Sequence, residues 1–271
     1  MAVATAERAV RLFREDGDEL GAILASPGLS AALRGLGRLD DALEVDLGAV
    51  RAATAAAAPP LVLARCLNAL AVTRLLRDDA GGAYLAAREA ARLLRATSDR
   101  YVLLAALRHM ALAAVGLGRR RDAVRLFERS HGLAVDLGDR VWATGLERDL
   151  AAAWIGDGRV DEAVVVLLRC LRTFREMRLR SGQAATLGLL AVAYRAAGRP
   201  AAASAAAHDA VRLADPADAR TPVVTGIVMR LTAPRPEPAD LLAPEGSSPR
   251  SSGCSHRSTP MLSERETVIP G

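Results

Sequence analysis

The chain has 271 residues, of which 51% are hydrophobic and only 3% aromatic, and its formal net charge is +5. That length is enough to bury a core, and strand-favouring aromatic residues are scarce beside the helix formers alanine and leucine. All basic residues are arginine, and they alternate with acidic ones, as in Arg175-Glu176-Met177-Arg178. A nucleic-acid interface gathers its basic residues and interleaves aromatic ones, so we expect solvated helix faces and no direct nucleic-acid binding by this chain.

The three cysteines, Cys66, Cys170 and Cys254, lie far apart and form no C-x-x-C pair. Their odd number and their spacing predict neither a disulfide framework nor a zinc site. Free thiols of this kind are typical of a reducing compartment, so the sequence predicts a cytoplasmic protein.

The chain begins with an apolar pattern that charged residues interrupt at Glu7, Arg8, Arg11 and Arg14. This pattern predicts an amphipathic helix and not a signal peptide. We therefore expect residues 1–29 to form one or two N-terminal capping helices. Further along, the longest uncharged stretches, such as residues 182–194, are shorter than the roughly 20 residues that span a bilayer. No membrane association is expected.

A six-residue phrase that starts with glycine recurs after these helices. Its copies are Gly37-Arg-Leu-Asp-Asp-Ala42, Gly118-Arg-Arg-Arg-Asp-Ala123, Gly158-Arg-Val-Asp-Glu-Ala163 and Gly198-Arg-Pro-Ala-Ala-Ala203. The last three glycines are evenly spaced, and they define a period of about 40 residues. The first two are separated by about two periods, and a degenerate copy, Asp78-Asp-Ala-Gly-Gly-Ala83, lies between them. A period of this length indicates a repeat protein.

Each copy has the layout of a helical hairpin. Apolar residues before the turn are spaced as on one helix face, as in Leu187, Leu190, Ala191 and Tyr194. The glycine then supplies the left-handed residue that ends the first helix, and a second helix follows with a small alanine at its crossing point.

The linkers between hairpins repeat as well. Asp99 and Asp139 lie one period apart, and each is expected to cap the N-terminus of the next helix. Pro200 lies where a proline in the first helical turn is tolerated.

This pattern resembles the tetratricopeptide repeat (TPR). The best copy has Leu190-Ala191, Tyr194, Gly198, Ala203 and Ala210, and the next best has Trp154, Gly158, Ala163 and Cys170. The copies near residues 42 and 83 depart from it, because Asp78 replaces the glycine and Leu33 and Arg74 replace the aromatic residue. The resemblance implies an all-α fold: a TPR-like α-solenoid of about five hairpins over residues 30–215, which acts by binding.

The period is longer than the roughly 34 residues that are usual for such repeats. It resembles the long-repeat arrays of large ATP-binding bacterial transcriptional regulators of the LuxR/MalT or SARP/NB-ARC type, in which helix pairs end in phrases like Val135-Asp-Leu-Gly-Asp-Arg140. Near the C-terminus, Leu262-Ser263-Glu264-Arg265-Glu266 resembles the opening of a LuxR-type helix-turn-helix domain. A chance match and a truncated regulator both stay open.

Beyond the array the periodic pattern decays. Residues 216–232 are expected to form a short helix that caps the open end of the stack, since terminal repeats need a polar cover. Residues 233–271 are rich in proline and serine and cannot bury enough apolar surface to order themselves, so we expect a disordered tail.

The familiar patterns of catalytic and cofactor sites do not emerge from the sequence. Gly35-Leu36-Gly37 lacks the remaining glycine of a dinucleotide loop, and a chain without lysine has no P-loop. The four histidines, His109, His131, His208 and His256, show no metal-ligand spacing. We therefore expect no enzymatic activity, no cofactor and no metal.

The binding site is expected on the first helix of each hairpin, which lines the concave side of such stacks. The polar residues rotated off the packed face are Arg65, Asn68, Arg108, His109, Arg148, Asp149 and Arg195. Asn68, Arg108 and Arg148 recur once per period, which predicts a ladder along one wall of the groove. Arginine binds carboxylates well, so an acidic peptide, a C-terminal carboxylate or an acidic helix is the expected ligand. The alternative is that these arginines are ordinary solvated positions.

The sequence therefore predicts a protein- or peptide-binding module that is the sensing or docking part of a bacterial transcriptional regulator. Two alternatives keep the same fold. One is a stand-alone sensor of a signal peptide, and the other is an assembly scaffold or adaptor that associates with itself through its alanine-rich faces.

Overall fold

The structure is a computed structural model, and it describes residues 2–96 and 99–213. Within these ranges there are eleven α-helices, one short 3-10 helix and no strand. The helices are Ala2–Glu15 (α1), Glu19–Gly35 (α2), Leu39–Ala55 (α3), Pro60–Leu76 (α4), Ala80–Leu93 (α5), Arg100–Gly116 (α6), Arg120–Asp136 (α7), Arg140–Gly156 (α8), Val160–Glu176 (α9), Arg180–Ala196 (α10) and Pro200–Leu213 (α11), with the 3-10 helix at Leu94–Ala96 (η1). The predicted all-α repeat fold is confirmed, whereas the expected cap at 216–232 and the tail at 233–271 lie outside the described residues.

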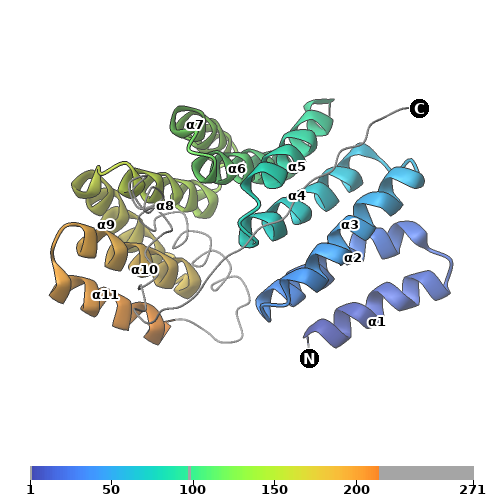
Figure 1. Cartoon of the computed structure of the whole chain (residues 1–271), viewed down its shortest axis with the longest axis horizontal. Coiled ribbons are helices and arrows are strands. Elements are labelled where there is room, and N and C mark those ends of the chain that lie inside the picture. The colour runs from blue at the N-terminus through green and yellow to red at the C-terminus, as the bar shows by residue number, and fades with distance from the viewer. Residues whose placement is uncertain (1, 97–98, 214–271) are drawn as a thin grey trace, which may run out of the picture. The chain divides into compact units, whose positions relative to one another are not determined.

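The helices follow one another in chain order across the array, from blue α1 to orange α11 (Figure 1). From α6 onward each helix begins half a period after the one before. Each helix packs against its neighbours in the chain, and the even-numbered helices α2 to α10 also contact the next even-numbered one. We call this even-numbered series the inner helices. Helix α2 packs against α3. It spans residues 29 and 30, where the sequence predicted the boundary between the capping helices and the repeat array.

Left-handed residues end the helices, as the glycine spacing predicts. Gly37, Gly118, Gly158 and Gly198 have φ values of 73°, 71°, 79° and 69°. At the Gly118 turn, the Arg119 N–H donates to the Ala114 carbonyl at 2.8 Å and so closes the helix end. Asp78, which stands where the degenerate copy lacks glycine, adopts the same conformation with a φ of 62°.

The turn between α9 and α10 places Arg178 in the left-handed region, with a φ of 54°. The left-handed conformation is about 1–2 kcal/mol less favourable for a residue with a Cβ than for glycine. Glycine also gives the unfolded chain more conformational entropy, and this offsets part of the stability gained by removing the Cβ. We expect Arg178→Gly to raise the free energy of unfolding by about 1 kcal/mol. Urea denaturation measures this change. Arg175→Gly, in the last turn of α9, is the control and should instead lower stability by about 1 kcal/mol.

Aspartates cap several helices at their N-termini. The predicted caps are confirmed: Asp99 accepts a hydrogen bond from the Val102 N–H at 2.9 Å, and Asp139 accepts one from the Trp142 N–H at 3.0 Å. Asp18 and Asp79 cap α2 and α5 in the same way. Helix α11 begins at Pro200, where the sequence predicted it.

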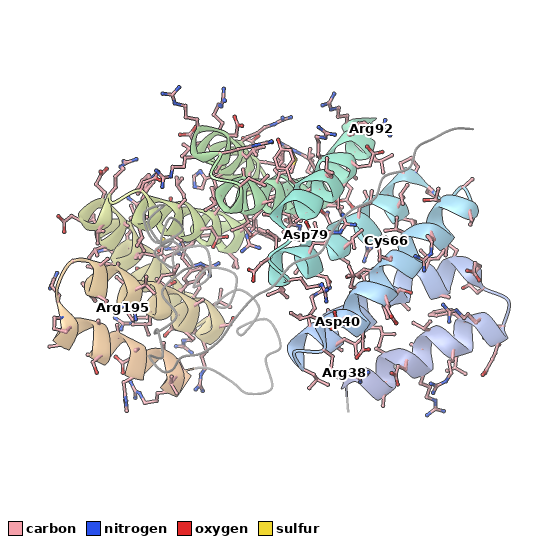
Figure 2. The ribbon with its side chains drawn as sticks, viewed as in Figure 1. Arg38, Asp40, Cys66, Asp79, Arg92 and Arg195 are labelled. Atoms are coloured by element: carbon pink, nitrogen blue, oxygen red, sulfur yellow. The ribbon has the colours of Figure 1, made fainter. Side chains whose placement is uncertain are left out.

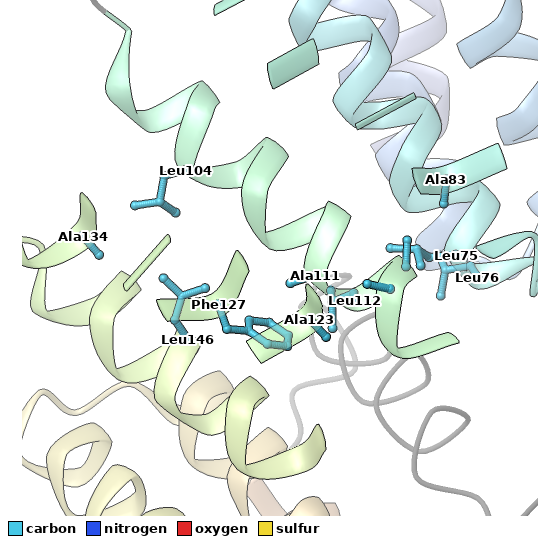
Figure 3. Packing of buried hydrophobic residues seen from close by; sticks show 12 residues of the cluster. Leu75, Leu76, Ala83, Leu104, Ala111, Leu112, Ala123, Phe127, Ala134 and Leu146 are labelled. Carbon is cyan, nitrogen blue, oxygen red and sulfur yellow. The ribbon is translucent and has the colours of Figure 1, made fainter. Parts of the chain in front are cut away.

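The core continues from one hairpin into the next. The alanine at each predicted crossing point is buried, at Ala42, Ala83, Ala123, Ala163 and Ala203. Figure 3 shows Leu104 of α6, Phe127 of α7 and Leu146 of α8 in one cluster. Packing of this kind holds each inner helix against the helices before and after it. No helix in the described ranges combines the length and the hydropathy needed to cross a membrane.

Candidate functional site

The seven predicted site residues divide into two groups. Arg65 on α4 and Arg195 on α10 are exposed, and Figure 2 labels Arg195 near the C-terminal end of the array. The other five lie at the contacts between inner helices, where Asn68, His109, Arg148 and Asp149 are buried and Arg108 is half-buried. The structure therefore corrects the expected ladder of free side chains: these residues mainly bond with one another.

The contacts of the ladder run from each inner helix to the next. Asn68 on α4 lies 3.4 Å from His109 on α6, measured between Oδ1 and Nδ1. Arg108 on α6 donates from Nε to Oδ2 of Asp149 on α8 at 2.6 Å. Both pairs join residues 41 positions apart. Asn68 and Arg108 therefore each contact the residue that follows their own counterpart in the next repeat.

Asp149 holds two arginines. Besides Arg108, its Oδ1 accepts hydrogen bonds from Nε and Nη2 of Arg148, at 3.1 and 2.8 Å. Burial alone would raise the pKa of Asp149, but the charges and hydrogen bonds of the two guanidinium groups outweigh burial and hold its pKa below the ordinary value. Asp149 is thus ionised at neutral pH, and the cluster keeps one positive charge that it does not compensate.

His109 takes part in this contact as a neutral ring. Its burial, helped by the positive charges of Arg108 and Arg34, lowers its pKa from 6.5 to about 3. Its role is to join α4 and α6 by a hydrogen bond rather than to carry charge.

A cavity of about 340 Å³ opens beside the two arginines, between α6, α8 and α10. Arg108 and Arg148 form its polar edge, and its apolar wall includes Trp142, Phe174 and Leu179. The guanidinium carbon of Arg148 lies 6.0 Å from the centre of the Phe174 ring. Among the described residues, no acceptor bonds to Nη1 or Nη2 of Arg108 or to Nη1 of Arg148. The cavity therefore combines free arginine donors with an aromatic wall.

Two features of the local sequence make room for this cavity. Gly145 faces open space, because a Cβ there would meet no atom within 4 Å, whereas Arg65 occupies the same repeat position on α4. Gly182 admits the Phe174 ring, whose Cδ1 lies 2.5 Å from the position a Cβ would take. Comparing the repeats position by position is the signal that could have identified Gly145 and Gly182. Trp142 and Phe174 carry no such signal, since aromatic residues in repeats are usually core.

The two cysteine thiols in the described part of the chain are buried. Burial raises the pKa of Cys66 to about 11 and that of Cys170 to about 12, so both stay protonated at neutral pH. Within the described ranges, no group of three or more His, Cys, Asp or Glu side chains is arranged to hold a metal ion.

Comparison with known proteins identifies the fold. No model of a known protein family matches the sequence, and neither does any curated protein. Among solved structures, BtubC (BKLC) from P. vanneervenii matches over 95% of this chain and 98% of its own, with a TM-score of 0.60 and 16% identity. A putative kinesin light chain from Podosopora anserina with nearly identical TPR-like repeats matches over 70% of this chain and 93% of its own, with a TM-score of 0.52 and 18% identity.

Aspartyl phosphate phosphatase F from Bacillus subtilis is also similar, with a TM-score of 0.58 and 13% identity. The match covers 74% of this chain and 54% of the phosphatase chain. At these identities the likeness concerns the fold and not the activity. The chain has a TPR-like α-helical repeat fold.

Proposed function

We propose that this chain is a protein- or peptide-binding module that holds an acidic partner on its inner helices and makes or breaks no bond. The observation that carries the proposal is the cavity edge at Arg108 and Arg148, where two guanidinium groups share the single carboxylate of Asp149. An acidic group of the partner would supply the charge that the cluster lacks.

The position of these arginines favours binding over a purely structural role. The Arg148 side chain is only 9% exposed, so water solvates its guanidinium poorly. A carboxylate at the free Nη atoms would gain charge-assisted hydrogen bonds at little further desolvation cost to the protein. The same reasoning does not apply to Arg65 and Arg195, which are exposed and already hydrated.

We further propose that the module is the sensing or docking part of a bacterial transcriptional regulator. The support is the long repeat period and the fragment Leu262–Glu266, which resemble such regulators. TPR-like repeats occur in proteins as different as a kinesin light chain and an aspartyl phosphate phosphatase, so the fold does not choose among these roles.

Peptide arrays test the binding proposal. The purified chain is applied to peptides that carry Asp and Glu and to the same peptides with Asn and Gln in their place. We expect the acidic set to be retained at least tenfold better at low salt, and this advantage should shrink as ionic strength rises. Equal retention of both sets would show that the arginine pair does not select the partner.

A partner captured with an acidic peptide region then tests the regulator role. A partner with an ATP-binding or DNA-reading domain supports it. A structural protein, or a second copy of this chain, would instead favour the scaffold alternative.

A further inference from the structure

We infer that the cavity between α6, α8 and α10 binds one specific chemistry: a single carboxylate joined to one compact, flat apolar group. This inference rests on the proposed function and narrows it to a ligand class. The carboxylate would lie at the free Nη atoms of Arg108 and Arg148, and the apolar group against Trp142 and Phe174.

The charge of the cluster limits the ligand to one negative charge. Arg108 and Arg148 carry two positive charges, and Asp149, whose side chain has no exposed surface, neutralises one of them. One added carboxylate would bring the net charge of these three side chains to zero. A phosphate ester or a run of acidic residues would leave excess negative charge next to buried Asp149, which is unfavourable where water is excluded.

The shape of the cavity limits the apolar part. Its volume of about 340 Å³ is at the lower end of the range for small-molecule sites. Arg148 already lies over the Phe174 ring, so a flat group can stack beside it and still reach the guanidinium with its carboxylate.

The site occurs once in the described part of the array. In the preceding repeat the ladder residue is Asn68, whose amide donates to the Val102 carbonyl at 3.1 Å. In the following repeat, the position that corresponds to Asp149 in the Arg108 contact is Leu189, which is apolar and offers Arg148 no carboxylate. Arg148 therefore turns back to Asp149 and leaves Nη1 to the cavity, and we expect one ligand per chain.

Two sources can present this chemistry: a free small acid, or the terminal residue of a peptide. Isothermal titration calorimetry separates them with phenylacetate and with N-acetyl-L-phenylalanine, each compared with its uncharged amide. We expect at least one acid to bind at a stoichiometry of one and at least tenfold more tightly than its amide. Binding of N-acetyl-L-phenylalanine alone would identify the peptide end as the source.

Two matched glycine variants test the location. Gly145→Leu projects a side chain into the cavity, whereas Gly132→Leu on α7 projects one into open space away from it. Both replace a helical glycine by a good helix former, so both should fold. We expect Gly145→Leu to abolish binding of the acid and Gly132→Leu to leave it unchanged.

Acid binding that survives Gly145→Leu, or amides that bind as well as acids, would overturn this assignment. If neither acid binds while acidic peptides are still retained on the arrays, the ligand class is wrong and the proposed function stands. If the arrays fail as well, both are wrong.

Discussion

Asp149→Asn should lower the free energy of unfolding by about 3–5 kcal/mol, the cost of leaving a buried charge without its partner. The carboxylate of Asp149 is fully buried and is bonded to both Arg108 and Arg148. Without it, two guanidinium groups remain close together with no compensating charge. Because the folded pKa of Asp149 is lowered, its contribution is present above the ordinary carboxyl pKa of about 3.9 and is lost as the pH falls below that value.

The matched control is Asp136→Asn. Asp136 pairs with Arg100 at 2.9 Å on the surface, so we expect a loss of less than about 1 kcal/mol. Replacing the whole cluster at once, as Arg108→Met, Arg148→Met and Asp149→Leu, should recover most of the stability that Asp149→Asn removes, because no unpaired charge then remains. Urea denaturation at pH 7 measures all three. A loss for Asp149→Asn no larger than for Asp136→Asn would contradict this account of the cluster.

His109→Gln should make the protein more resistant to acid. The unfolded chain binds a proton at His109 near pH 6.5, whereas the folded chain binds it only near pH 3, mainly because the ring is buried. The native state therefore loses stability as the pH falls between these values, at about 1.4 kcal/mol per pH unit for this one group. Glutamine keeps a hydrogen-bonding group for Asn68 and cannot take up a proton in this range.

We expect the variant to gain about 2 kcal/mol relative to the wild type between pH 7 and pH 5. Urea denaturation at both pH values measures the difference. His208→Gln on α11 is the control, because His208 is exposed and its removal leaves the core untouched. If the two variants show the same pH dependence, the buried ring of His109 does not govern acid stability.

Much of the fold could be predicted because local residues dictate it. The glycine spacing, the Asp99 and Asp139 caps and the crossing alanines each depend on a few neighbouring residues. The first repeats are harder to place, because Ala57 and Asp78 adopt the left-handed conformation at turns that no glycine marks in the sequence.

The candidate site shows where sequence reasoning ends. The repeat period correctly put Asn68, Arg108 and Arg148 at equivalent places on the inner helices. It could not show that they are buried, since that depends on how closely neighbouring helices approach. Nor could it show that Arg108 would find Asp149 rather than solvent, because the register between two helices depends on packing that is not local in sequence.

The offset of one residue between ladder partners also restricts how this array can grow. Alanine and leucine positions are alike from repeat to repeat, so the apolar core alone would accept a duplicated hairpin. The polar contacts would not, because a second copy of residues 100–139 after the first would bring Arg108 against the copied His109 in place of Asp149. The half-buried Arg108 would then lack its carboxylate. The polar contacts therefore select against this duplication, which the apolar core by itself would accept.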